Sequence, residues 1–106
     1  MTRALTSVPA ARQVRRDIRF RQAMAARTVA VDWRSEGLCL RHDPELFFPN
    51  AAEDPAPALA ICRTCPVAGP CLAAALEAGE CDGVWGGTTP DERRRMRQVW
   101  VATASA

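Results

Sequence analysis

The chain has 106 residues, of which 48% are hydrophobic and 25% are charged, and its formal net charge at pH 7 is +2. This length fits one small domain, and no stretch approaches the roughly 18 apolar residues that a membrane span needs. The first twenty residues also lack the apolar core of a secretory signal peptide, so we expect a cytoplasmic protein whose thiols stay reduced.

Charge is distributed unevenly along the chain. Residues 1–31 carry seven arginines and one aspartate, residues 32–90 carry three arginines and nine acidic residues, and residues 91–106 carry four arginines and two acidic residues. The net charges of these segments are therefore +6, −6 and +2. An acidic central segment between basic ends suits a protein-binding domain whose terminal segments approach nucleic acid. An arginine-rich transit peptide is the alternative interpretation of the first segment.

The N-terminal segment, residues 1–31, has a weak helical pattern. Val14 and Ile18 lie at helical spacing, and a few apolar residues follow one to two turns later. Because this apolar stripe is thin, we expect an arginine-rich extension that is partly helical or disordered. Asp32 then begins the main domain, residues 32–89, as a candidate N-cap of a short helix that carries Cys39.

Prolines interrupt the middle of the chain. Four of them between residues 43 and 58 prevent long regular structure, except for one helical turn at residues 44–47. Short helices are predicted over residues 56–65 and 70–78, and Gly79 follows the second one as a helix stop.

The last part of the chain combines a turn and a helix. Residues 83–89, GVWGGTT, predict a glycine-rich β-turn. Thr89 and Glu92 form a capping box with proline at the first helical position, so a basic helix and a short tail occupy residues 90–106. With no βαβ pattern and no internal repeat, the sequence predicts a small, mainly α domain of three to five short helices.

The five cysteines carry the strongest chemical signal. Three of them follow the spacing CxxCx5C and a fourth lies upstream with 22 residues in between: Cys62, Cys65, Cys71 and Cys39. Four thiolates from separate short elements can bind zinc or an iron–sulfur cluster. Zinc sites commonly pair two CxxC motifs, whereas this chain has one, followed by proline. The wide, irregular spacing therefore favours an iron–sulfur cluster, with zinc as the alternative.

Other uses of the thiols remain open at this point. The odd count leaves one thiol outside a purely disulfide-bonded framework. Cys81 is the spare thiol: it could replace Cys71 as a ligand, act as a resolving thiol, or be an incidental half-buried cysteine. His42 is the natural fourth zinc ligand if one cysteine is excused, or else a solvated loop residue. Thiol–disulfide chemistry and inert cysteines are the remaining interpretations.

Several motifs occur in a fixed order between residues 32 and 97. They are DWR at 32–34, a cysteine six residues after the tryptophan, DPELFFP at 43–49, CxxCPVxxxCLxxAL at 62–76, GVWGG at 83–87 and a TxxERR helix start. Together they resemble the WhiB-like family of iron–sulfur transcription regulators. The combination is highly specific, although CxxC alone would be a weak signal.

The resemblance implies a set of functional expectations. The domain would fold around a [4Fe–4S] cluster held by Cys39, Cys62, Cys65 and Cys71. The protein would be a cytoplasmic transcription regulator that responds to oxygen or nitric oxide. It would dock on the C-terminal domain (region 4) of the primary sigma factor of RNA polymerase and could also bind promoter DNA. It would have no enzyme activity, no membrane partner and no small-molecule substrate.

The family also implies a partner surface. Its expected members are Trp33, Phe47, Phe48, Gly83, Val84, Trp85, Gly86 and Gly87. Large aromatic side chains would slow water and oxidants at the cluster and anchor a partner. Alternatively, Trp85 is an ordinary core residue and at least one of the two phenylalanines belongs to the core.

Three features depart from the family pattern: the extra Cys81, the arginine-rich extension, and an end at residues 98–106 with no AT-hook or long basic tail. Candidate DNA contacts are Arg93, Arg94, Arg95 and Arg97, which would bind phosphates in a sequence-tolerant, salt-sensitive way or simply form a solvated helix face.

Two functions compete with the sigma-binding regulator: a disulfide reductase that uses the CxxC pair of the apo form, and a structural zinc module that presents an interaction surface.

Overall fold

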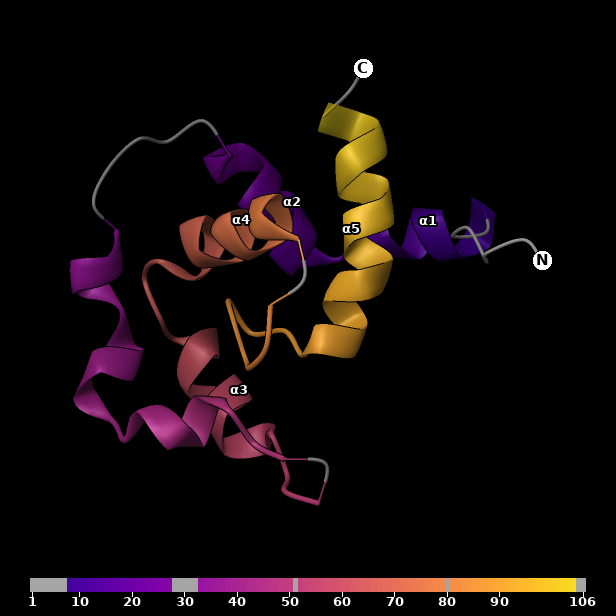
Figure 1. Ribbon diagram of the computed structural model, residues 1–106. Coiled ribbons are helices and arrows are strands. Elements are labelled where there is room, and N and C mark those ends of the chain that lie inside the picture. Colours follow the sequence, from indigo (N-terminus) through magenta and orange to yellow (C-terminus); the bar gives the residue numbers. More distant parts are fainter. Residues whose placement is uncertain (1–7, 28–32, 51, 80, 105–106) are drawn as a thin grey trace.

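The computed structural model describes residues 8–27, 33–50, 52–79 and 81–104. Within these ranges the chain forms five α-helices and three 3-10 helices but no β-strand, which confirms the mainly helical fold (Figure 1). In chain order the elements are α1 (Val8–Arg16), α2 (Ile18–Ala26), η1 (Arg34–Glu36), η2 (Leu38–Arg41), η3 (Pro44–Phe47), α3 (Ala56–Arg63), α4 (Ala68–Ala78) and α5 (Pro90–Ala104).

The helices of the two ends of the chain pack together around α4. Figure 1 shows α2 beside α4, with α5 crossing close to both and α1 on the far side of α5. Their buried side chains form the main core: Val14, Phe20, Ala23, Leu72, Ala73, Leu76, Met96, Val99 and Trp100. The rings of Phe20 and Trp100 meet edge to face with centroids 6.0 Å apart, a favoured geometry for aromatic pairs. The described part of the N-terminal segment is therefore part of the core.

The N-terminal helical pattern is interrupted at Asp17. This residue has an extended backbone, with φ −65° and ψ 124°, and its carboxylate accepts a hydrogen bond from the Arg19 N–H at 2.9 Å as the N-cap of α2. Because the break changes the direction of the helix, Val14 is buried whereas Ile18 is 61% exposed. Phe20 and Ala23 form the buried face of α2 instead.

A smaller group of elements lies on the other side of the molecule. α3 packs against η2 and η3, and a second cluster of buried side chains joins them to the glycine-rich segment: Phe47, Ala58, Cys62 and Val84. The Val84 N–H donates to the Phe47 carbonyl at 2.7 Å. The predicted helix around Cys39 forms as two 3-10 turns because Gly37 is extended between them. Its predicted N-cap, Asp32, lies outside the described residues.

The predicted capping box at the start of α5 is confirmed. The Thr89 N–H donates to the Glu92 carboxylate at 3.1 Å, and the Glu92 N–H donates to the Thr89 hydroxyl at 3.3 Å. Gly79 follows the last residue of α4 with φ 96°, as expected for a glycine that ends a helix. In the part of the chain that the structure describes, no helix combines the length and apolar character that crossing a membrane requires.

Candidate metal centre

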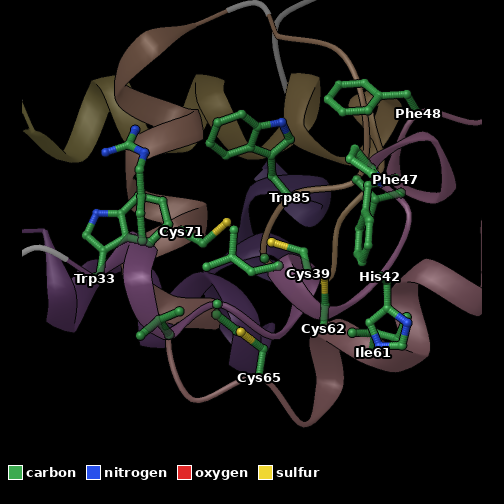
Figure 2. A pocket seen from close by; sticks show the side chains of 18 residues that line it. Trp33, Cys39, His42, Phe47, Phe48, Ile61, Cys62, Cys65, Cys71 and Trp85 are labelled. Carbon is green, nitrogen blue, oxygen red and sulfur yellow. The ribbon is translucent and has the colours of Figure 1, made fainter.

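Four cysteines from different elements line one cavity of about 350 Å³ (Figure 2). Cys39 lies on η2, Cys62 on α3 and Cys71 on α4, while Cys65 lies in the turn between α3 and α4. The rest of the wall is mostly apolar and includes two tryptophans and two phenylalanines. A volume of this size falls within the range of about 300–1,000 Å³ that is typical of ligand pockets.

Local backbone geometry explains how the CxxC pair faces the cavity. α3 ends at Arg63, and the Cys65 N–H closes a tight turn by donating to the Cys62 carbonyl at 3.1 Å. Pro66 cannot continue the helix because it lacks an N–H group. Cys71 is the fourth residue of α4, so its sulfur lies near the positive end of the helix dipole, which favours a negative ligand.

The glycine-rich turn places backbone amides near two of the sulfurs. The amide of Gly86 favours the thiolate of Cys71, and the amide of Gly87 favours that of Cys62, so each opposes the rise in pKa that burial causes. Amide donors of this kind stabilise negative charge on sulfur and tune the potential of iron–sulfur clusters. The sequence had indicated these glycines only as turn and partner residues, so their influence on the thiols was missed.

Burial makes bare thiolates unfavourable in this cavity. It raises the pKa of Cys71 to about 12, and the other thiols add to the shift while the Gly86 amide opposes it. Burial likewise raises the pKa of Cys62 above its ordinary value. A coordinated metal reverses this preference because its charge deprotonates a thiol outright. The site is therefore suited to thiolates that bind a cationic group.

The spread of the donors bears on the size of that group. Among the described residues, no three His, Cys, Asp or Glu side chains lie close enough to hold one ion. A tetrahedral zinc site with Zn–S bonds of about 2.3 Å brings its sulfurs to about 3.8 Å from one another. Here the four sulfurs line a cavity of about 350 Å³, which leaves room for a group larger than one ion.

Cys81, the other candidate ligand, lies away from this cavity. Its thiol is 4.0 Å from the Ala75 carbonyl, and it lines a separate hollow beside Arg93 and Arg97. His42 is exposed and lines the cavity with the cysteines. The structure thus brings Cys39, and not Cys81, to the CxxC pair and Cys71.

The aromatic residues of the predicted partner surface divide into buried and accessible ones. Phe47 is 6% exposed and belongs to the second core cluster, whereas Phe48 is 56% exposed. Trp33 and Trp85 are half-buried in the cavity wall (Figure 2). The Arg34 guanidinium lies 4.5 Å from the centre of the Trp33 ring, a cation–π contact that holds the ring in place.

The segment around Trp85 is shaped by close packing. Gly83, Val84 and Gly86 are buried, so they position the tryptophan rather than offer contact area. Gly86 and Gly87 have φ of 54° and 77° and connect the β-bridge between Trp85 and Thr88. Such a pair of positive φ values suits a tight turn and favours glycine.

The arginines of α5 do not form one exposed face. Arg93 is 4% exposed, and its guanidinium donates to the carbonyls of Thr88 (2.9 Å), Cys81 (3.0 Å) and Gly83 (2.6 Å). Arg97 is half-buried and donates to a carbonyl near the end of α4 at 2.9 Å. The expectation that Arg93 contacts nucleic acid is therefore corrected, because its guanidinium is enclosed in the fold. For the half-buried Arg97 such a contact stays a prediction.

Two arginines of the predicted set remain accessible. Arg94 and Arg95 are both exposed. Arg94 is paired with Asp91 one turn earlier in the helix. Of the predicted set, these two side chains offer the most accessible positive charge on α5.

A further arginine, which the sequence analysis missed, contacts the glycine-rich turn from outside the matched motifs. Arg19 donates to the Gly87 carbonyl at 2.8 Å and forms an ion pair with Glu92 at 3.1 Å. These partners lie 68 and 73 residues away in the sequence, so no local pattern could have indicated the contact.

Comparison with known proteins identifies a family for this chain. The family model for the transcription factor WhiB matches residues 33–96. The transcriptional regulator WhiB1 of Mycobacterium tuberculosis is 44% identical over 73 residues, which cover 64% of this chain and 87% of the relative. WhiB1 of Bifidobacterium longum is 45% identical over 74 residues (65% and 80%), and WhiB of Streptomyces coelicolor is 39% identical over 69 residues (65% and 79%). The family match spans more than half of the chain and includes all four cavity cysteines, so the chain belongs to the WhiB family of transcription factors.

Proposed function

We propose that this WhiB-family transcriptional regulator holds a [4Fe–4S] cluster on Cys39, Cys62, Cys65 and Cys71. The observation that carries the proposal is that four distant thiols, and no fifth one, line a single cavity within the described residues. The two amide donors and the raised pKa of the buried thiols support it, because both suit thiolates bound to a cationic group.

The residues around the thiols would protect and adjust such a group. When bound, a [4Fe–4S] cluster would supply redox chemistry and sensitivity to oxygen or nitric oxide. Trp33, Phe47 and Trp85 lie in the cavity wall and limit the access of water. The amides of Gly86 and Gly87 favour the thiolates of two cysteines, which ties the position of the turn to the state of the thiols.

The proposed partner is region 4 of the primary sigma factor of RNA polymerase, in the cytoplasm. Phe48 and the half-buried Trp33 and Trp85 gather accessible aromatic area at the mouth of the cavity, and such side chains are common anchors at interfaces. Trp85 is adjacent to Gly86 in the chain and lines the same cavity, so a change at the thiols that moves the turn would also move this side chain. The cluster state would thereby control sigma binding and promoter choice.

A contact with promoter DNA is a secondary part of the proposal. Arg94 and Arg95 are the members of the predicted set that remain exposed. Two arginines provide a weak, sequence-tolerant contact that falls with added salt. Binding of DNA would therefore depend on the sigma factor and RNA polymerase.

The competing functions have less support. A disulfide reductase needs a reactive thiolate, whereas Cys62 is buried and its pKa is raised. The similar proteins are named as transcriptional regulators. A structural zinc module remains the alternative for the metal, since zinc also binds four thiolates.

Metal analysis tests the first part of the proposal. The protein is purified without oxygen and assayed for iron, acid-labile sulfide, zinc and visible absorption. We expect iron and sulfide in wild type and in Cys81→Ala, and their loss in Cys39→Ala. Colourless protein with stoichiometric zinc would refute the cluster. A Cys39→Ala variant that keeps its full absorption would show that another residue is the fourth ligand.

Binding to purified sigma region 4 tests the partner. Phe48→Ala and Trp85→Ala should each weaken binding by about 2 kcal/mol, the usual loss for an aromatic hot spot, while the iron content stays unchanged. Val101→Ala is the matched control, because Val101 is also an exposed apolar residue but lies on α5 away from the cavity. Equal binding by all three variants would place the interface elsewhere.

A further inference from the structure

The N-terminal helices reach the thiol cavity through one side chain. Arg19 on α2 donates to the Gly87 carbonyl at 2.8 Å. The same guanidinium makes two hydrogen bonds of 3.1 Å to the Glu92 carboxylate and pairs with Asp17 at 2.5 Å. Arg19 therefore connects α2, the glycine-rich turn and the first turn of α5. It lies outside residues 33–96, which match the family.

The partners of Arg19 are themselves fixed. Glu92 accepts the Thr89 N–H in the capping box, and Asp17 caps α2. The pKa of Asp17 is lowered mainly by its hydrogen bond with Arg19, against the effect of burial. Burial is the largest influence at Glu92 and raises its pKa, but the hydrogen bonds from Arg19 and the Thr89 N–H together outweigh it, so this pKa is lowered as well. The guanidinium is thus held on two carboxylates, and its remaining hydrogen bond is directed at Gly87. Charge-assisted hydrogen bonds in such a fixed arrangement are stronger and more directional than neutral ones.

Gly87 transmits this contact to the sulfurs. Its carbonyl accepts from Arg19, while a Cβ on Gly87 would lie 3.7 Å from the Cys62 Cβ, and its amide favours the Cys62 thiolate. The preceding Gly86 lines the same cavity as Cys71, and its amide favours the Cys71 thiolate. Two consecutive glycines have wide conformational freedom, so the direction of these amides depends on what holds the turn. Arg93 holds its start and end from inside, through Gly83 and Thr88, and Arg19 holds Gly87 from outside.

We propose that Arg19 is a positioning residue of the thiol cavity. It fixes the Gly86 and Gly87 amides toward Cys71 and Cys62 and so makes the N-terminal helices part of the site. If the protein holds a cluster, as the proposed function requires, the fixed amides raise the reduction potential of that cluster, because amide donors stabilise its more negative, reduced state. The positioning of the turn itself does not depend on the identity of the metal.

Amide hydrogen exchange of the full-length, metal-free protein tests the positioning. In Arg19→Met the amides of residues 85–88 should exchange about tenfold faster, which corresponds to the loss of a charge-assisted hydrogen bond. Arg19→Lys keeps the charge but not the fork that bridges three partners, so an intermediate effect is expected. Arg21→Met is the matched control, since Arg21 is exposed on the same helix and has no ion pair among the described residues.

The same variants, loaded with iron, provide a second measurement. Arg19→Met should shift the midpoint potential to more negative values, and Arg21→Met should leave it unchanged. The proposal is supported if Arg19→Met accelerates amide exchange only at residues 85–88 and also makes the midpoint potential more negative.

Three results would overturn it: exchange at 85–88 that equals the Arg21→Met control, a uniform acceleration that includes the buried amides of α4, or an unshifted potential. If wild type binds no cluster, the proposed function fails, and the exchange data still decide the role of Arg19.

Discussion

The two adjacent glycines of the GVWGG turn, Gly86 and Gly87, should lose very different amounts of stability on substitution by alanine. Both have positive φ, 54° at Gly86 and 77° at Gly87. A Cβ on Gly86 would lie 2.6 Å from the Leu72 Cβ and 2.7 Å from the Ala68 carbonyl oxygen of α4. A Cβ on Gly87 would meet nothing closer than 3.7 Å.

The magnitude follows from two separate costs. A non-glycine residue in the left-handed region costs about 1–2 kcal/mol, and both alanine variants share this cost. Only Gly86→Ala also forces an atom against a helix backbone and the fully buried Leu72, and overpacking of this kind costs about 1–3 kcal/mol. We therefore expect a loss of about 1 kcal/mol for Gly87→Ala and about 3 kcal/mol for Gly86→Ala.

Urea unfolding of the metal-free variants measures this difference directly. The free energy of unfolding is taken from the midpoint and slope of each transition. Gly86→Ala should in addition lose iron more readily than Gly87→Ala, because moving the turn away from α4 withdraws the Gly86 amide from Cys71. Equal free energies within about 0.5 kcal/mol, which is the size of an ordinary surface effect, would refute the packing of the turn on α4.

Three other outcomes are expected. Arg93→Met should cost about 3–5 kcal/mol in urea unfolding, since it leaves several buried carbonyls unsatisfied at about 1–3 kcal/mol each; a loss as small as that of Arg94→Met would contradict this. Phe20→Ala should cost about 3–5 kcal/mol, and a near-zero effect would show that α2 does not pack in the core. The pKa of Cys71 is raised from 9.0 to about 12, so between these pH values the unfolded chain releases a proton that the folded metal-free protein keeps, and stability falls as pH rises above 9. Thermal unfolding at pH 8 and 10 measures this fall, and Cys71→Ser should reduce it.

Local features of this protein could be predicted from its sequence because their partners are close along the chain. The capping box joins Thr89 and Glu92, and Gly79 ends the helix that directly precedes it. The single turn at residues 44–47 forms where proline permits it. The mainly helical fold class follows from the sum of such signals. Spacing alone left the metal group open between iron–sulfur and zinc, and the family resemblance implied a [4Fe–4S] cluster on four of the cysteines.

The tertiary structure decided the questions that depend on burial. Sequence could not distinguish Phe47 from Phe48 or Arg93 from Arg94, since neighbouring residues of the same type differ only in the direction of their side chains. Phe47 is buried under the glycine-rich segment and Arg93 is enclosed by carbonyl groups, whereas Phe48 and Arg94 face solvent.

The composition of the site was likewise decided by contacts between distant segments. Cys39 faces the CxxC pair and Cys81 does not, because η2 packs against α3 while Cys81 lies beside α4 and α5. The N-terminal segment joins the core and reaches Gly87 through Arg19. Helical periodicity reports neighbours three or four residues away, and it holds no information on a contact that spans 68 residues. Sequence thus determined the chemistry available to this protein, and packing determined which of its residues share the site.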